Sequence, residues 1–402
     1  MEITTRRRSG TIVSCEVFNE PSPERIEQLH RLKIAIGANV KVPFWGCTQV
    51  CDISKFSDLV NAAAIFPSYF DLLNSTSLSI PLKWMQRAPR GAHSGQSTPS
   101  DNPSTPTRSS RPSRPKRLAK ERDNERCVLT KASMIEVAHI FPYCMIDPSK
   151  KTTNLDNSIP GFWKLLEFFF ETERLDTWRR ALFTDADPNK LSDGCHNNIC
   201  LSSWAHDLWT RGVFALRPVE VSHDCTAIKV EFYWQPRPTH GRFDSVDLLE
   251  QPGSSKGLNQ VDNASIGRPD SNGNMTFIQS GDVFTLTTDD PTTHPLPSFE
   301  LLDMQWHLNR IVSMTGAADV YDEYDEDDDD DGHVSDAVKD ESLSDLSDIS
   351  RLDIDSDTTA STGPSPAKPA QVQNVLPKQH IHVGDAEDDA EVSMQGLVES
   401  EG

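Results

Sequence analysis

The chain has 402 residues, 27 prolines and a formal net charge of −22. No stretch reaches the roughly 18 consecutive apolar residues that a membrane-spanning helix needs, so the composition argues against a membrane-embedded protein. The charge does not exclude a nucleic-acid partner, because 25 of the 61 acidic residues and only 4 of the 39 basic residues follow Ala318, which leaves the rest close to neutral.

Residues 1–90 carry helical patterning, and the sequence assigns them no function. The stretch "SPERIEQLHRLKIAIG" (22–37) opens with a Ser-Pro pair and closes with a glycine, which predicts a helix. The stretch "DISKFSDLVNAAAIF" (52–66) repeats apolar residues at helical intervals and predicts a second helix. Cys47 and Cys51 have no matching second pair, so we interpret them as buried thiols rather than as half of a metal site.

Residues 91–120 are rich in Ser, Thr, Pro and Arg, which predicts a disordered linker. Its end, "RSSRPSRPKRLAK" (108–120), contains six basic residues and no acidic one. Such a run is typical of a nuclear localisation signal or of an arm that neutralises nucleic-acid phosphates, and a solvated linker with an incidental charge bias is the third interpretation. The candidate nucleic-acid-binding residues are Arg108, Arg111, Arg114, Lys116, Arg117 and Lys120.

Residues 121–318 are richer in apolar and aromatic side chains and contain both helical and strand patterns, which predicts an α+β domain. The predicted strands are 126–131, 135–141, 213–220, 226–236 and 282–288, and the predicted helices are 161–183, 200–209 and 297–314. The first of these helices contains the run "FWKLLEFFF". Without interleaved basic residues, this run is more typical of a protein core than of a platform for stacked bases.

Residues 319–402 contain an aspartate run and Ser/Asp repeats, which predict a disordered acidic tail. Acidic phosphorylation sites and a solubilising tail are two interpretations of the repeats. A surface for a histone or another protein partner is a third. A segment that folds back on basic residues of the same chain and competes with DNA is a fourth.

The eight cysteines form no CxxC pair, and no apolar run follows the N-terminus. We therefore expect reduced thiols and an intracellular protein without a secretion signal, and the basic run described above is its candidate nuclear signal.

Three polar residues are of types whose side-chain chemistry suits phosphodiester hydrolysis. His139 ends the apolar part of "IEVAHIFPYC" (135–144), and Asn197 and His206 lie in "HNNICLSSWAHDLW" (196–209). Hydrolysis requires a base that activates water and a cation that stabilises charge on the phosphate. A histidine suits the base because its ordinary pKa lies near 6.5, an amide side chain can hold a loop by donating and accepting at once, and an imidazole on a facing helix can bind a metal.

The stretches "RCVLTK", "EVAHIFP", "NNICLSSWAHDLW" and "GVFAL" resemble the HNH endonucleases, and in particular the fungal HNH endonuclease-domain family. The stretches "GDVFTLTTDDP" and "HPLPSFELLDMQWHLNRI" extend this resemblance, which covers about residues 122–318. It implies a ββα-metal (HNH) finger embedded in a larger mixed α/β domain, between the disordered linker and the acidic tail.

The resemblance also implies roles for single residues. His139 would be the general base, Asn197 would orient that base and pin its loop, and His206 would be a metal ligand on the following helix. Ala138 and Thr210 occupy two positions where many HNH enzymes have further ligands. Glu136 shares a strand face with Ala138 and is the candidate second metal ligand.

Other features of this region bear on the same site. His196 is a weaker candidate on the loop beside Asn197, and Asp207 should point away because it lies about 100° round the helix from His206. The gap of 57 residues between His139 and Asn197 is long for an HNH finger. We expect helix 161–183 to be an insertion that packs on the finger and leaves the two motif halves adjacent in space.

The resemblance therefore implies a metal-dependent endonuclease that hydrolyses phosphodiester bonds in DNA with a divalent ion such as Mg²⁺, Mn²⁺, Ni²⁺ or Zn²⁺. The residues at positions 138 and 210 favour an alternative, a catalytically degenerate HNH-fold module that binds nucleic acid or a protein. The expected partner is DNA, with no membrane association, and a protein partner of the acidic tail is the second expectation.

Overall fold

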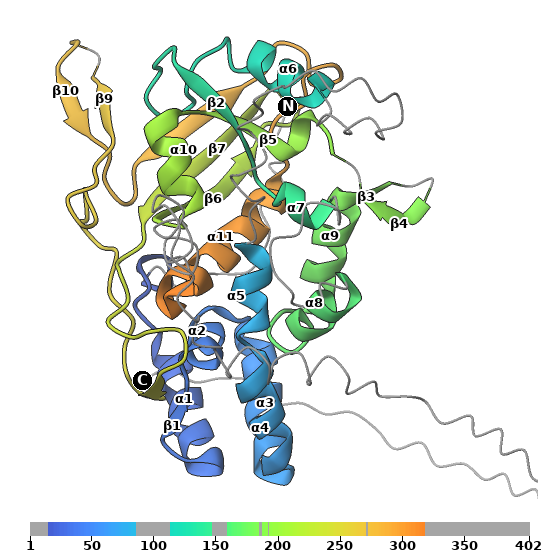
Figure 1. Ribbon diagram of the computed structural model, residues 1–402, viewed down its shortest axis with the longest axis vertical. Helices are drawn as coiled ribbons and strands as arrows, with labels where there is room; N and C mark the ends of the chain where they lie inside the picture. Colours follow the sequence, from blue (N-terminus) through green and yellow to red (C-terminus); the bar gives the residue numbers. More distant parts are fainter. Residues whose placement is uncertain are drawn as a thin grey trace, which may run out of the picture. The chain divides into compact units, whose positions relative to one another are not determined.

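Figure 1 shows the computed structural model of the chain, which describes residues 15–85, 113–146, 159–184, 187–191, 193–270 and 272–317. The predicted acidic tail and most of the predicted linker, with Arg108 and Arg111, lie outside these residues. Within them, helices are mixed with small antiparallel sheets, which confirms the α+β class. No helix in the described part combines the length and the apolar character needed to cross a bilayer.

The N-terminal part is a group of short helices. Ser22 caps the first long helix by accepting a hydrogen bond from the backbone N–H of Arg25, and Pro23 occupies the first helical position, so the predicted helix start is confirmed. The elements are η1 (Glu16–Phe18), α1 (Pro23–Ile36), β1 (Asn39–Lys41), α2 (Val42–Val50), α3 (Ile53–Ile65), α4 (Pro67–Thr76) and α5 (Ser79–Trp84). Cys47 and Cys51 are buried free thiols, as expected, and burial raises the pKa of Cys47.

The C-terminal half is built on a three-stranded antiparallel sheet in the order β11-β7-β6. Its strands were predicted from their β-branched and aromatic residues, and the prediction is confirmed. The elements of this half are β6 (Phe214–Val221), β7 (Ala227–Trp234), β8 (Ser245–Asp247), β9 (Gly267–Pro269), β10 (Met275–Phe277), β11 (Val283–Thr287) and α11 (Phe299–Thr315). Strand β8 pairs with β1, which ties this half to the N-terminal helices.

Helix α11 lies at the centre of the molecule, between the sheet and the N-terminal helices (Figure 1). It contacts β6, α2, α5 and α9, so all of its residues from Leu301 to Thr315 are buried. Two of its polar side chains accept hydrogen bonds from other helices: Trp84 Nε1 donates to Asn309 at 2.6 Å, and Arg174 donates to Asp303 at 2.7 Å. Most of the buried apolar residues of both halves form one large core around this helix, and Val17, Ala215, Tyr233 and Trp306 form a second, small cluster.

The region between the two halves contains a strand pair followed by a helix. Its elements are α6 (Ser113–Arg122), β2 (Ile135–His139), α7 (Tyr143–Ile146), α8 (Ile159–Leu166), α9 (Thr172–Leu182), β3 (Phe183–Thr184), β4 (Asp187–Leu191), η4 (Cys195–Asn197), β5 (Asn198–Ser202) and α10 (Ser203–Thr210). Strand β2 pairs antiparallel with β5, and α10 packs on both strands.

The single helix predicted for 161–183 is wrong, because the segment forms two helices, α8 and α9. The break is held from the N-terminal part: the N–H of Asp52 donates to the Phe169 carbonyl, and the Asp52 carboxylate accepts from the N–H of Glu171. Phe169 and Phe170 at the break are fully buried, which confirms that the aromatic run belongs to the core.

Three further local predictions are corrected. Residues 126–131 form a turn rather than a strand, closed by a hydrogen bond from the N–H of Lys131 to the Cys127 carbonyl. The predicted helix 200–209 begins only after Ser202, which ends β5 and caps α10. Residues 113–120 were assigned to the linker, but they belong to α6. This helix packs on the protein because Pro115, Ala119 and Arg122 are buried.

Candidate active site

The pairing of β2 with β5 brings the two halves of the motif together. His139 at the end of β2 lies opposite Asn198, the residue after Asn197. The N–H of Ile140 donates to the Asn197 carbonyl at 2.9 Å. The expected adjacency across 57 intervening residues is therefore confirmed.

Asn197 pins the loop that follows β2. Its side chain is fully buried, its Oδ1 atom accepts a 2.7 Å hydrogen bond from the Phe141 N–H, and its Nδ2 atom donates to the Phe141 carbonyl at 3.2 Å. Only an amide can satisfy both backbone groups of one residue in this way. The loop beyond His139 is thus fixed to the turn η4.

His139 contacts a carboxylate that the sequence did not single out. Its Nε2 atom lies 3.3 Å from Asp193 Oδ2, and Asn197 Nδ2 lies 3.5 Å from the other oxygen of Asp193. Burial pushes the pKa of Asp193 upward, but its contacts with His139, Asn197 and Asn198 outweigh burial and hold the pKa below its ordinary value. An ionised Asp193 favours the tautomer of His139 with the proton on Nε2, which leaves Nδ1 as an acceptor.

Helix α10 positions His139 from the other side. Trp209 Nε1 donates to the His139 carbonyl at 3.1 Å, and the ring of Tyr143 lies 5.2 Å from the imidazole. The side chain of His139 is 10% exposed, so it is enclosed but still reaches solvent.

The second pair of polar residues joins the same strand to the same helix. His206 Nδ1 on α10 lies 2.6 Å from Glu136 Oε2 on β2. Glu136 precedes His139 by three residues, which is about 10 Å along a strand. Slight burial raises the pKa of Glu136, but hydrogen bonds from Ser203 and His206 outweigh it and lower the pKa overall. Both side chains are partly exposed, 26% for His206 and 49% for Glu136, and a ligand can reach them.

The neighbouring positions do not extend this pair. Ala138 is fully buried, the Thr210 hydroxyl donates to the Asp207 carbonyl at 2.8 Å, and Asp207 pairs with Arg211 at 3.1 Å. His196 turns to the Ala181 carbonyl, 3.2 Å away. Across the described ranges, no three side chains of His, Cys, Asp or Glu come together as a ligand set for a metal. His206, with its ring oriented by Glu136, can supply one ligand to a cation whose remaining ligands are water and phosphate oxygens.

Four of the six candidate nucleic-acid-binding residues belong to helix α6, which packs on β5, β2 and η4. Arg114 and Arg117 are exposed, and Lys116 and Lys120 are partly exposed. Arg117 forms an exposed ion pair with Glu121 at 2.7 Å. The basic side chains therefore stand on a helix that leans directly against the strands of the site.

A strand ending in His139, a pinned turn with Asn197 and a helix carrying His206 together define a strand-turn-helix site of the ββα type. The family model described as HNH endonuclease matches residues 127–217. These residues form an HNH endonuclease domain. Neither the curated proteins nor the solved structures gave a match to the chain.

Proposed function

We propose that the protein is a metal-dependent endonuclease that hydrolyses phosphodiester bonds in DNA. The observation that carries the proposal is that strand β2 carries both the His139–Asp193–Asn197 network and, three residues earlier, the His206–Glu136 pair. Phosphodiester hydrolysis needs a base and a bound cation, and these two groups supply a histidine oriented by a carboxylate and a second histidine that can bind a cation.

His139 acts as the general base through Nδ1. Asp193 accepts a hydrogen bond from the Nε2–H group of His139. Its negative charge stabilises the imidazolium that forms when Nδ1 takes a proton from water. The water oxygen then bonds to phosphorus while one ester P–O bond breaks. Asn197 keeps the loop and the Asp193 carboxylate in place during this transfer.

His206 would hold the divalent cation through Nε2, and Glu136 would orient its imidazole through Nδ1. When bound, such an ion polarises the phosphate and stabilises the leaving oxygen. The hydrogen bond between His206 Nδ1 and Glu136 leaves Nε2 of His206 available for the ion, in the way that carboxylates orient metal-binding histidines.

The basic residues of α6 bind the phosphate backbone of the DNA. Arg114, Lys116, Arg117 and Lys120 lie on one helix beside the site, and contacts of this kind position a duplex without reading its sequence.

A second candidate function is a catalytically degenerate HNH module that binds nucleic acid or a protein partner without cutting. It is favoured by the buried Ala138 and by Thr210, which bonds back to its own helix, since neither supplies a further metal ligand. The two candidates differ in whether the parent protein cleaves DNA at all.

The deciding experiment is a nicking assay on supercoiled plasmid with the full chain and Mg²⁺, Mn²⁺, Ni²⁺ or Zn²⁺. We expect nicking that EDTA abolishes and that His139→Ala reduces by a factor of about 100 or more. His240→Ala is the matched control, because His240 also pairs with a glutamate, Glu250, at 2.6 Å. If the parent binds the plasmid but leaves it intact with every ion, the degenerate module replaces the nuclease.

A further inference from the structure

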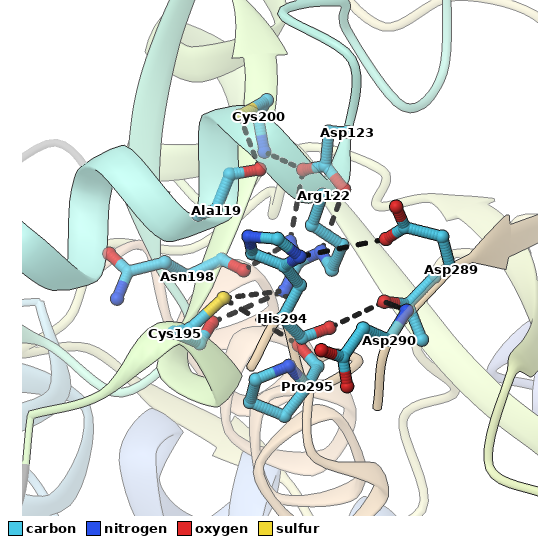
Figure 2. Close-up of polar contacts among 11 residues, drawn as sticks. Ala119, Arg122, Asp123, Cys195, Asn198, Cys200, Asp289, Asp290, His294 and Pro295 are labelled. Carbon is cyan, nitrogen blue, oxygen red and sulfur yellow. Dashed lines mark hydrogen bonds and ion pairs between the residues drawn. The ribbon is translucent and has the colours of Figure 1, made fainter. Parts of the chain in front are cut away.

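A buried arginine at the end of α6, Arg122, donates hydrogen bonds to the backbone of the turn that carries Asn197. Figure 2 shows this cluster around Arg122 and Asp123, whose side chains are 0% and 3% exposed. The five N–H groups of a guanidinium need five acceptors when they are removed from water. Arg122 has five oxygen acceptors, so its charge is buried without an unmet donor.

Two of the five contacts go to its neighbour in sequence. Arg122 Nε and Nη2 donate to the two oxygens of Asp123 at 2.8 and 2.9 Å, a bidentate pair. The same carboxylate accepts from the N–H of Cys200 in β5 at 3.0 Å. Asp123 thus neutralises the arginine and holds β5 at the same time.

Two further contacts go to backbone carbonyls on either side of Asn197. Arg122 Nη1 donates to the Cys195 carbonyl at 3.2 Å, and Nη2 donates to the Asn198 carbonyl at 2.8 Å. One of these carbonyls lies two residues before Asn197 and the other directly after it. The Arg122–Asp123 pair therefore fixes the backbone on both sides of the residue that pins the His139 loop.

The fifth contact fixes the same turn to the start of α11. Arg122 Nη1 donates to the Pro295 carbonyl at 3.0 Å, and the N–H of Ser298 donates to the His196 carbonyl at 2.9 Å. His294, the residue before Pro295, has its Nε2 atom 3.2 Å from Glu121 Oε2 of α6, and Figure 2 shows the contacts around His294. Three segments far apart in sequence meet at this one guanidinium.

We propose that Arg122 is a positioning residue for the reaction, which sets the turn of Asn197 and, through it, the geometry of Asp193 and His139. This inference rests on the proposed function. A shift of about 1 Å in a catalytic group can lower a rate by a factor of about 100. Arg122 does not touch the substrate in this role, so its loss should lower the rate of cleavage rather than the affinity for DNA.

The test uses the full-length protein and Arg122→Lys, which keeps the charge but offers fewer donors and no planar fork. Arg126→Gln is the matched control, because Arg126 also donates to a backbone carbonyl, that of Lys131, but is exposed. Four quantities are measured for each protein: the melting temperature, the DNA affinity without divalent ion, the single-turnover cleavage rate, and the hydrogen exchange of the Ile140 and Phe141 amides, which bond to Asn197.

For Arg122→Lys we expect exchange at these two amides to rise about 10-fold or more and the cleavage rate to fall about 10- to 100-fold, with DNA affinity within about twofold of the parent. Unchanged exchange at residues 140 and 141 overturns the proposal. A uniform rise in exchange across the core with a lower melting temperature also overturns it, because that result describes a purely structural residue.

Asp123→Asn is the second variant for the case in which Arg122→Lys does not fold. It keeps the arginine's three carbonyl contacts and weakens the bidentate pair together with the hydrogen bond from the Cys200 N–H. If neither variant folds, Arg122 is structural and the proposal is wrong. If the parent itself does not cut DNA, the proposed function fails, while the exchange at residues 140 and 141 still decides whether Arg122 holds the turn.

Discussion

His139 Nε2 lies 3.3 Å from Asp193 Oδ2, although 54 positions separate the two residues in the chain. A carboxylate that accepts the proton of one imidazole nitrogen fixes the tautomer and makes the other nitrogen the basic one. We therefore expect Asp193→Asn to lower the single-turnover cleavage rate about 10- to 100-fold with unchanged DNA affinity.

The control for this variant is Asp207→Asn, because Asp207 pairs with Arg211 instead of a histidine of the site. It should cleave at the parental rate. Equal rates for Asp193→Asn and the parent would show that His139 does not depend on this carboxylate.

The His206–Glu136 pair leads to a prediction about cation binding that needs no cleavage assay. Isothermal titration with Mn²⁺ should show binding by the parent, no measurable binding by His206→Ala, and about 10- to 100-fold weaker binding by Glu136→Gln. The exposed pair His240–Glu250 has the same 2.6 Å separation and supplies the controls His240→Ala and Glu250→Gln. Identical affinities for Glu136→Gln and Glu250→Gln would remove Glu136 from the cation site.

Asn197 should matter for stability as well as for activity. Asn197→Ala leaves the N–H and the carbonyl of Phe141 without their partners in a buried setting, and we expect it to lower the free energy of unfolding by about 2–4 kcal/mol in urea denaturation. Asn259→Ala at an exposed position should change it by less than about 0.5 kcal/mol. A similar loss in both variants would contradict the pinning role.

The basic face of α6 predicts a change in the salt dependence of DNA binding. Replacing Lys116, Arg117 and Lys120 together by Gln should reduce the slope of log affinity against log salt by about 2–3, since each phosphate contact contributes about 0.9. Fluorescence anisotropy with a labelled duplex across a salt series measures this slope. As the control, Lys229→Gln together with Lys256→Gln, both at exposed positions outside α6, should leave the slope unchanged.

His307 on α11 predicts a pH dependence of stability. Burial and the nearby charge of Arg174 lower its pKa and outweigh the opposite effect of Asp303 and Asp52. The unfolded chain then binds a proton more readily than the folded one, so the free energy of unfolding should fall as the pH drops below about 6.5, by at most about 1.4 kcal/mol per pH unit. Asp303, whose pKa is lowered by Arg174 despite burial, adds a further loss only below about pH 4.

Urea denaturation at several pH values from 7 to 4.5 checks this prediction, with His307→Gln as the test variant. The variant should flatten the decline between pH 6.5 and 4.5. An equal decline in the parent and in His307→Gln would assign the acid sensitivity to other groups.

The sequence was sufficient for elements whose signals are local. Helix α11 starts close to its predicted start at residue 297, because Ser298 accepts from the Leu301 N–H. The strands β6, β7 and β11 follow their β-branched and aromatic residues. The resemblance also predicted that the two motif halves lie adjacent in space, but it did not identify residues 198–202 as the strand that pairs with β2.

The rest depends on contacts between segments far apart in sequence. The break between α8 and α9 is held by Asp52, more than 110 residues earlier, and no pattern within 161–183 encodes it. Asp193 lies four residues before Asn197 in "SDGCHN", a short polar stretch that reads as an ordinary turn. Arg122 stands at the end of a basic run, so its burial beside Asp123 is invisible until β5 and the start of α11 are placed.

The separation of β2 from β5 in the chain has a consequence for the time at which the site is completed during synthesis. The polypeptide between them must emerge from the ribosome and fold before the two strands can pair, and the arginine that grips the turn also needs the Pro295 carbonyl. A growing chain that ends before residue 295 therefore holds His139 without its finished surroundings. If the proposed function holds, a truncated product that ends before residue 295 would lack the completed site and would not cut DNA.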